Sequence, residues 1–305
     1  MILLTQVVRI DYVLGVDGII LIMILVGGIS HIRKMNLEIL YLKTPIIIGM
    51  IIGKIHPGSG LGDQLFTYIT TRTIALDKGY DFGFVGKEFF RGKDFMQLDW
   101  GKEWFGSYEI APLSGKLTIQ NETKLWETPA YYDPEVNFIE DGTIIDATCA
   151  QDERYWGHRL NEIREWLKVE PLEMEENLFI VNFRGGEYTA MPDLFLPKEY
   201  WQSAFDYLLN FYKLLKIEFH TDDIESVEKM FNPNKEELRI IKDIALNWRS
   251  VRYAKHLILS NSAFGILPAL LNENVKEVVA PRYWARRNIK QWSMPSNYYK
   301  KFTYV

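Results

Sequence analysis

Strands and helices alternate through the second half of this chain, and that alternation limits its fold more than any other feature. Short apolar runs predict four strands, at residues 178–183, 217–220, 257–260 and 278–280. The stretches between and after them predict helices near residues 198–215, 224–231 and 264–271. Such an alternation is typical of a parallel, doubly wound sheet, whose ligands bind beyond the carboxyl ends of the strands.

A further α/β region comes earlier in the chain. An apolar run at residues 50–55 is followed by a glycine-rich turn and by a helical pattern that includes Leu65, Ile69 and Leu76. Residues 80–85 predict the next strand. The order strand, turn, helix and strand is the one that opens an α/β domain.

The glycine-rich turn, residues 59–66, reads Ser-Gly-Leu-Gly-Asp-Gln-Leu-Phe. Glycine has no Cβ, so Gly60 and Gly62 allow the backbone to approach a ligand closely. The start of the helix behind the turn offers unpaired N–H groups. A turn of this kind serves tight packing about as often as ligand binding, and its sequence alone leaves both interpretations open.

Composition and missing motifs exclude several functional classes. The 305 residues suit two domains of ordinary size, and the net charge of −5 argues against a general nucleic-acid-binding protein. The single cysteine, Cys149, excludes an internal disulfide framework and makes a reducing, cytosol-facing location the simpler expectation. Motifs of phosphate-binding-loop NTPases, zinc proteases, Gly-x-Ser-x-Gly hydrolases and Gly-x-Gly-x-x-Gly oxidoreductases are missing.

The first 49 residues do not fit the α/β pattern. Residues 18–28 are apolar but short for a bilayer span, which needs about 20 residues. Extension back to Tyr12 includes Asp17, which costs about 2.5–3.5 kcal/mol near the centre of a membrane helix. The basic residues at 31–34 would keep the rest of the chain on the cytoplasmic side. Membrane association through residues 12–30 and a non-native or dispensable extension are equally compatible with the sequence.

Polar residues follow three predicted strands of the doubly wound region. Arg184 follows the first strand, and an arginine there can form a bidentate pair with a phosphate. Asp222 and Asp223 follow the second, where carboxylates at a helix start are most often caps. Asn261 and Ser262 follow the third and lead into a helix whose N-terminus is a natural phosphate site. For Arg184 the alternative is a surface arginine in a tight turn.

These segments resemble the α-1,2-fucosyltransferases of glycosyltransferase family 11. The turn at residues 59–66 is similar to the family's Gly-Gly-Leu-Gly-Asn-Gln-(Met/Leu)-Phe, with Ser59 for the first glycine and Asp63 for the asparagine. Residues 151–156 resemble its Gln-Ser-Glu-Lys-Tyr-Phe segment. Similar blocks continue in the family's order to about residue 284.

The strand-end motifs match the family with substitutions. Residues 181–188 resemble its His-x-Arg-Arg-x-Asp motif, but Asn182, Gly185 and Glu187 replace the histidine, the second arginine and the aspartate. Arg184, which the family ties to the donor diphosphate, is unchanged. Residues 220–223 are similar to the family's Ser-Asp-Asp motif. The block at residues 255–264 is similar to Lys-His-x-Ile-x-Ala-Asn-Ser-x-Phe, and residues 265–267, Gly-Ile-Leu, stand where the family usually has Ser-Trp-Trp.

The resemblance implies a GT-B-like α/β fold, with two Rossmann-type domains facing a cleft. We expect an acceptor-side domain at residues 50–171 and a nucleotide-sugar-binding domain at 172–292, between the extension at 1–49 and a C-terminal tail at 293–305. The implied reaction is an inverting transfer of fucose from GDP-fucose to a hydroxyl of an acceptor glycan. The expected partners are thus a sugar nucleotide and an oligosaccharide, in the cytoplasm or at the cytoplasmic face of a membrane.

The same resemblance assigns residue roles. It places seven residues against the donor: Arg184, Asp222, Asp223, Asn261, Ser262, Ala263 and Phe264. Arg184 and the helix start would stabilise the leaving diphosphate, so no metal or other cofactor is expected, in keeping with the missing Asp-x-Asp motif. Gly60, Gly62 and Gln64 would shape the cleft.

Two carboxylates are candidates for the general base, whose effective pKa should lie near the working pH. Glu187 is a candidate by motif position and Asp63 by its place on the facing loop, where it could instead be a helix cap. The replaced histidine and arginine leave two alternatives open. One is a glycosyltransferase with another sugar nucleotide, and the other is a non-catalytic glycan- or nucleotide-binding protein.

Overall fold

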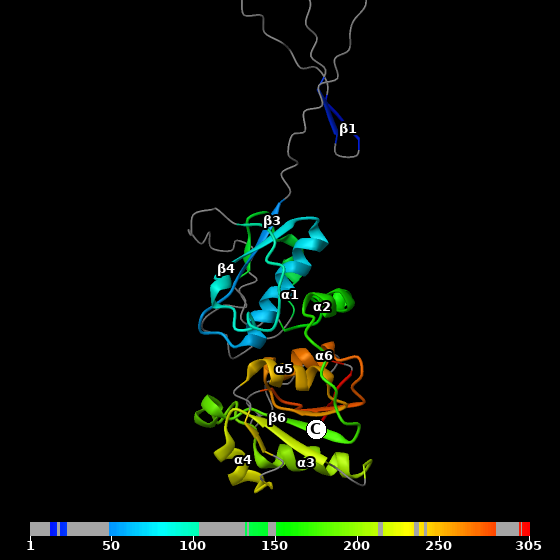
Figure 1. Cartoon of the computed structure of the whole chain (residues 1–305). Coiled ribbons are helices and arrows are strands. Elements are labelled where there is room, and N and C mark those ends of the chain that lie inside the picture. Colours follow the sequence, from blue (N-terminus) through cyan, green and yellow to red (C-terminus); the bar gives the residue numbers. More distant parts are fainter. Residues whose placement is uncertain are drawn as a thin grey trace, which may run out of the picture. The chain divides into compact units, whose positions relative to one another are not determined.

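A computed structural model of the chain describes residues 13–16, 19–22, 49–103, 132, 134–145, 151–212, 216–234, 238–240, 243–284, 299 and 301–305. The chain divides into two compact units, residues 1–48 and 49–305, which we describe separately (Figure 1). In the first unit, strands β1 (Val13–Val16) and β2 (Ile19–Ile22) pair antiparallel. The remainder of the predicted extension up to residue 48 lies outside the described residues, as does Cys149. Among the residues described, no helix is long and apolar enough to cross a membrane.

The second unit begins with a small parallel sheet in the order β4-β3-β5. Its strands are β3 (Met50–Lys54), β4 (Asp81–Val85) and β5 (Ile144–Ile145). Helix α1 (Leu61–Lys78) connects β3 to β4 and buries Leu65 and Ile69 completely. It ends at Gly79, whose φ of +67° is a left-handed conformation that glycine adopts without strain.

Short helices complete this first region. They are the 3₁₀ segments Lys87–Phe89, Pro134–Phe138 and Gly157–Arg159, and helix α2 (Leu160–Trp166). Residues 167–177, which follow α2, contain no helix or strand and lead into the second sheet.

The second sheet has six parallel strands in the order β11-β10-β9-β6-β7-β8. They are β6 (Leu178–Phe183), β7 (Lys216–Thr221), β8 (Leu238–Ile240), β9 (His256–Leu259), β10 (Glu277–Ala280) and β11 (Thr303–Tyr304). Numbered along the chain from β6, this is the order 3-2-1-4-5-6 of doubly wound folds. The order reverses between β6 and β9, so this is where a doubly wound sheet places its ligand.

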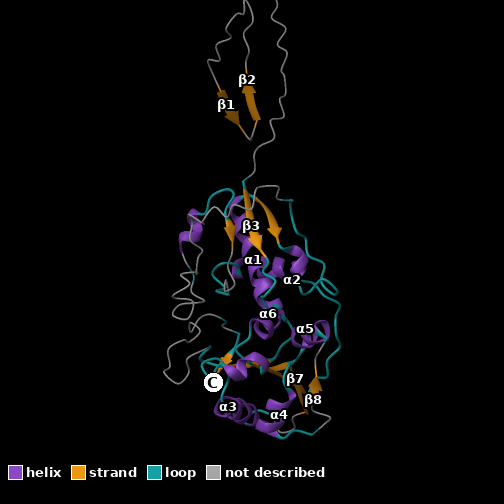
Figure 2. Ribbon diagram, turned by 90° about the vertical axis from the view of Figure 1, so that its left-hand side faces the viewer, coloured by secondary structure: helices purple, strands orange, loops and turns teal. Residues whose placement is uncertain are grey.

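Helices cover both faces of the six-stranded sheet. Helices α3 (Lys198–Leu209) and α4 (Ile224–Phe231) lie on one face, and α5 (Ile244–Tyr253) and α6 (Ala263–Leu271) lie on the other (Figure 2). Helix α6 also packs against α1 and α2 of the first region. One apolar cluster therefore contains buried residues of both sheets, such as Ile51 and Leu259, together with Leu65 of α1.

The predicted fold class, α/β with two parallel sheets, is confirmed. The helix predicted near residues 198–215 ends earlier, at Leu209. Strands β5, β8 and β11 and helix α5 were not predicted. Residues 303–304, predicted to belong to a tail, form an edge strand because they pair in parallel with Val279 and Ala280. The other domain boundaries stay predictions.

Candidate active site

A cavity of about 400 Å³ opens at the reversal point of the six-stranded sheet and is also lined by the glycine-rich turn of the first region. Nine of the residues selected from the sequence line it: Gly60, Gly62, Asp63, Arg184, Glu187, Asp222, Ser262, Ala263 and Phe264. Residues far apart in the chain thus meet in one place. The cleft between two α/β regions, as predicted, is present in the structure.

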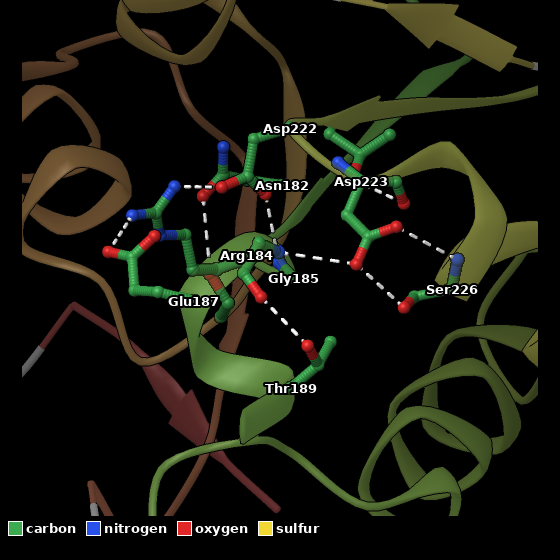
Figure 3. A network of polar contacts seen from close by, with 11 residues as sticks. Asn182, Arg184, Gly185, Glu187, Thr189, Asp222, Asp223 and Ser226 are labelled. Carbon is green, nitrogen blue, oxygen red and sulfur yellow. Dashed lines mark hydrogen bonds and ion pairs between the residues drawn. The ribbon is translucent and has the colours of Figure 1, made fainter. Parts of the chain in front are cut away.

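Arg184 is the centre of a polar network on the second-sheet side of the cavity (Figure 3). Its guanidinium donates to the carboxylates of Asp222 and Glu187 and lies 5.3 Å from the centre of the Tyr188 ring. Asp222 uses its other oxygen to accept from the Gly185 N–H at 2.9 Å. Asp222 therefore orients both the arginine and the turn that carries it.

The turn after β6 requires its two glycines. A Cβ on Gly185 would lie 2.4 Å from the Cβ of Asp223, and Gly186 has a φ of +48°. The Gly186 N–H donates to Asp223 at 3.2 Å. The close approach of the β6 and β7 ends therefore requires glycine at position 185.

Asp223 does not line the cavity. Its side chain caps α4, accepting from the Ser226 N–H at 3.0 Å and from the Ser226 hydroxyl at 2.7 Å. Burial raises the pKa of this carboxyl, but the hydrogen bonds from Ser226 and Gly186 outweigh it and hold the pKa below its ordinary value. The structure therefore gives Asp223 the capping role, and its donor contact stays a prediction.

Helix α6 begins directly at the cavity. The Ser262 carbonyl accepts from the N–H groups of Gly265 and Ile266, both at 3.0 Å. The N–H groups of Ala263 and Phe264 have no acceptor among the described residues. Free N–H groups at a helix N-terminus are suited to an anion such as a phosphate.

Gly62 brings the start of α1 against the start of α6. A Cβ at this position would lie 2.4 Å from the backbone nitrogen of Phe264 and from the carbonyl carbon of Ala263. Gly60, by contrast, has only the Asp63 carboxylate near it, at 3.7 Å from such a Cβ. Of the two glycines, Gly62 is the one that close packing demands.

Asp63 lies in the first turn of α1 and lines the cavity. Burial raises its pKa from 3.8 to about 6, against the opposing effects of a 3.5 Å hydrogen bond from Gln151 Nε2 and of the nearby Arg184 charge. Among the described residues, no backbone N–H donates to this carboxylate. The structure thus favours a titrating carboxylate over a helix cap.

Gln64 lies beneath the cavity, where it is 1% exposed. Its amide donates to the carbonyls of His56 and Phe89, at 3.1 and 3.0 Å, and accepts from the Arg91 N–H at 3.0 Å. Gln64 therefore fixes the loop that carries Arg91, and the Arg91 side chain lines the cavity. No sequence signal pointed to Arg91.

Asn261 is also structural. It is 1% exposed, and its amide donates to the carbonyls of Leu194 and Trp284, at 2.9 and 2.6 Å. Both of these residues line the cavity, so Asn261 holds its wall together from behind.

Several further residues line the cavity without having been selected: Leu61, Arg91, Gln151, Asn182, Phe183, Tyr188, Leu194, Ile244, Asn247 and Trp284. The carboxamide oxygens of Gln151 and Asn247 are buried and accept no hydrogen bond from a described residue. Among the residues that the structure describes, no three His, Cys, Asp or Glu side chains are grouped as a metal site.

No protein-family model and no curated protein matches the chain. Among solved structures it is similar to NodZ alpha-1,6-fucosyltransferase soaked with GDP-fucose, at 11% identity and a TM-score of 0.43, over 76% of this chain and 94% of that one. A selenomethionine form of NodZ from Bradyrhizobium gives 12% and 0.41 with the same coverage. The E. coli heptosyltransferase WaaC with ADP gives 11% and 0.37, over 84% and 92%. At these values the likeness carries no functional argument, which must come from the cavity itself.

Proposed function

We propose that the chain is an inverting glycosyltransferase that moves fucose from GDP-fucose to a hydroxyl of an acceptor glycan, without a metal or other cofactor. It would act in the cytoplasm or at the cytoplasmic face of a membrane. One observation carries the proposal: a half-buried carboxylate, Asp63, and a strand-end arginine, Arg184, line the same cavity from two different α/β regions.

Arg184 and the start of α6 form the side suited to a diphosphate. Arginine presents five N–H donors in a fork that matches phosphate oxygens. Glu187, whose side chain is 60% exposed, is the partner that a diphosphate would displace, while Asp222 continues to hold the arginine. The free N–H groups of α6 would stabilise the charge that develops on the leaving group.

Asp63 is the better candidate for the general base. A pKa of about 6 leaves it mostly ionised at neutral pH yet basic enough to accept a proton. Glu187 is more exposed and is already paired with Arg184. We therefore assign the proton transfer to Asp63 and a charge-balancing role to Glu187.

The proposed step follows from this placement. Asp63 takes the proton of the acceptor hydroxyl, whose oxygen forms the new bond to the anomeric carbon. The bond from that carbon to the diphosphate oxygen breaks, and its electron pair leaves with the diphosphate toward Arg184. Attack and departure on opposite faces invert the anomeric configuration.

A thermal-shift titration of the full chain with GDP, GDP-fucose, GDP-mannose, UDP-sugars and dTDP-sugars tests the proposal. A ligand at 100 times its Kd should add about 2.7 kcal/mol of stability. Stabilisation by GDP and GDP-fucose alone supports the assignment, whereas a response to another nucleotide would mean that the donor is a different sugar nucleotide. No response would favour a non-catalytic glycan-binding protein.

The variant Arg184→Ala sharpens the same titration. It should weaken sugar-nucleotide binding about 10-fold or more, because hydrogen bonds to a charged group contribute about 1.5–3 kcal/mol. Arg249→Ala is the matched control, since Arg249 hydrogen-bonds backbone carbonyls of Glu170 and Pro171 and does not line the cavity. Unchanged binding by Arg184→Ala would contradict the role of Arg184.

A further inference from the structure

Only one of the two polar atoms of the Gln151 side chain forms a hydrogen bond with a described residue. Gln151 is 5% exposed, lines the cavity and donates from Nε2 to Oδ1 of Asp63. Its Oε1 is buried and accepts no hydrogen bond from any residue that the structure describes. A buried carboxamide oxygen is unfavourable without a donor, so this oxygen is suited to a ligand that brings one.

Contacts at Gln151 and at the residue after it hold the backbone in place. Its carbonyl accepts from the Tyr299 hydroxyl at 2.8 Å. The next residue, Asp152, accepts from the Tyr132 N–H at 2.9 Å and pairs with Arg154 at 2.6 Å. The unused oxygen therefore belongs to a residue whose backbone is held in place, which lowers the entropy lost when a ligand binds.

Asp63 and Gln151 both line the cavity, and each has a side-chain oxygen that can accept a hydrogen bond. The amide that contacts Asp63 also carries Oε1, so the free oxygen lies one amide group away from the carboxylate. Two hydroxyls on neighbouring carbons of a sugar ring can donate to two such neighbouring acceptors at once. The pair of acceptors thus matches a vicinal diol better than an isolated alcohol.

We propose that Gln151 determines acceptor specificity by accepting a hydrogen bond from the hydroxyl next to the one that Asp63 deprotonates. The acceptor is then a sugar with a vicinal diol at the reacting position. The reacting hydroxyl gives its proton to Asp63, whereas its neighbour keeps its proton and only donates a hydrogen bond. This inference rests on the proposed function, in which Asp63 contacts the reacting hydroxyl.

The first test compares diol and deoxy acceptors. Transfer by the full chain is measured to methyl β-D-galactopyranoside and methyl β-D-glucopyranoside, and to monodeoxy derivatives lacking the hydroxyl beside the reacting one. We expect the wild type to lose about 10-fold or more in kcat/KM on the deoxy acceptor. Gln151→Met should show a raised KM for the diol and no such discrimination. An equal penalty in both proteins overturns the proposal.

Two further variants guard against a misfolded Gln151→Met. Gln151→Glu keeps an oxygen at the Oε1 position and should restore discrimination between diol and deoxy acceptors; failure to do so in a folded protein overturns the proposal. Gln202→Met is the matched control, because Gln202 donates to Asp206 at 2.8 Å on the exposed surface of α3, outside the cavity. It should behave as the wild type does.

A second readout needs no acceptor. The acidic limb of the pH profile for donor hydrolysis by water should move to higher pH in Gln151→Met, because Asp63 loses an N–H donor that stabilises its charged form. An acidic limb that does not move would mean that Gln151 does not contact Asp63, which overturns the proposal. Failure of the proposed function itself is distinguishable, since the wild type would then neither transfer nor hydrolyse any sugar nucleotide.

Discussion

The two sides of the cavity differ in how exposed their charged side chains are. On the first-sheet side Asp63 is half-buried, and desolvation raises its pKa to about 6. On the second-sheet side Arg184, 31% exposed, forms ion pairs with two carboxylates that are more exposed than Asp63. Burial suits a group that exchanges a proton, whereas exposed and exchangeable ion pairs suit a site that takes up and releases an anion.

Among the variants that test this difference, Asp63→Asn should have the largest effect. The substitution keeps the shape of the side chain but cannot accept the proton, so kcat for transfer should fall about 10²- to 10⁴-fold. Donor affinity, measured by titration with GDP, should change little, because Arg184 and α6 are untouched. Retention of the wild-type kcat would exclude Asp63 as the base.

A second comparison concerns the two glycines of the turn, Gly62, which is closely packed, and Gly60, which has open space around it. Gly62→Ala should lower the free energy of unfolding by about 1–3 kcal/mol, because its Cβ would collide with the backbone of α6. Gly60→Ala should change it by no more than about 0.5 kcal/mol, since Gly60 has an ordinary φ of −67° and space around it. Urea denaturation of both variants measures the difference. Equal effects would show that the α1–α6 contact is not as close as described.

The smallest effect concerns the pH dependence of stability. The pKa of Asp63 is higher in the folded state, about 6, than its ordinary 3.8, so the folded protein binds this proton more tightly than the unfolded chain. The resulting stabilisation is fully present below about pH 4 and is lost as the pH rises through 6. Relative to the wild type, Asp63→Asn should therefore gain about 2 kcal/mol in free energy of unfolding between pH 4 and pH 7.

Denaturant titrations of both proteins across this pH range provide the measurement. Asp77→Asn is a suitable control, since Asp77 lies at the other end of α1 and forms surface pairs with His158 and Arg159. A difference between wild type and Asp63→Asn that does not vary with pH would mean that Asp63 is as well solvated in the folded state as in the unfolded chain.

The fold was predictable where strands are buried on both faces. Strand β6 is an uninterrupted buried run, and strands of that kind are visible in a sequence as apolar stretches. Strands β5 and β11 have two residues each, too few for any periodicity. Helix α5 did leave signals, namely an Asp243 cap and the buried pair Trp248 and Val251. They were obscured by the polar residues between them.

The site was predictable where function depends on strand ends. Arg184 and Ser262 follow β6 and β9, and parallel strands bring such ends together at one edge of the sheet. Arg91 and Asn247 reach the cavity only through tertiary packing, which leaves no local pattern. The sequence also could not separate Asp222, which contacts Arg184, from Asp223, which caps α4, because the two carboxylates are adjacent.

The last described residues of the chain have a practical consequence. Tyr299 holds the Gln151 carbonyl, and β11 adds the edge strand of the six-stranded sheet a few residues later. Removing residues 299–305 would therefore loosen the part of the cavity wall that carries Gln151 while leaving Asp63 and Arg184 in place. If such a shortened protein lost turnover, the loss would reflect the missing contact to Gln151. It would not contradict the role proposed for Asp63.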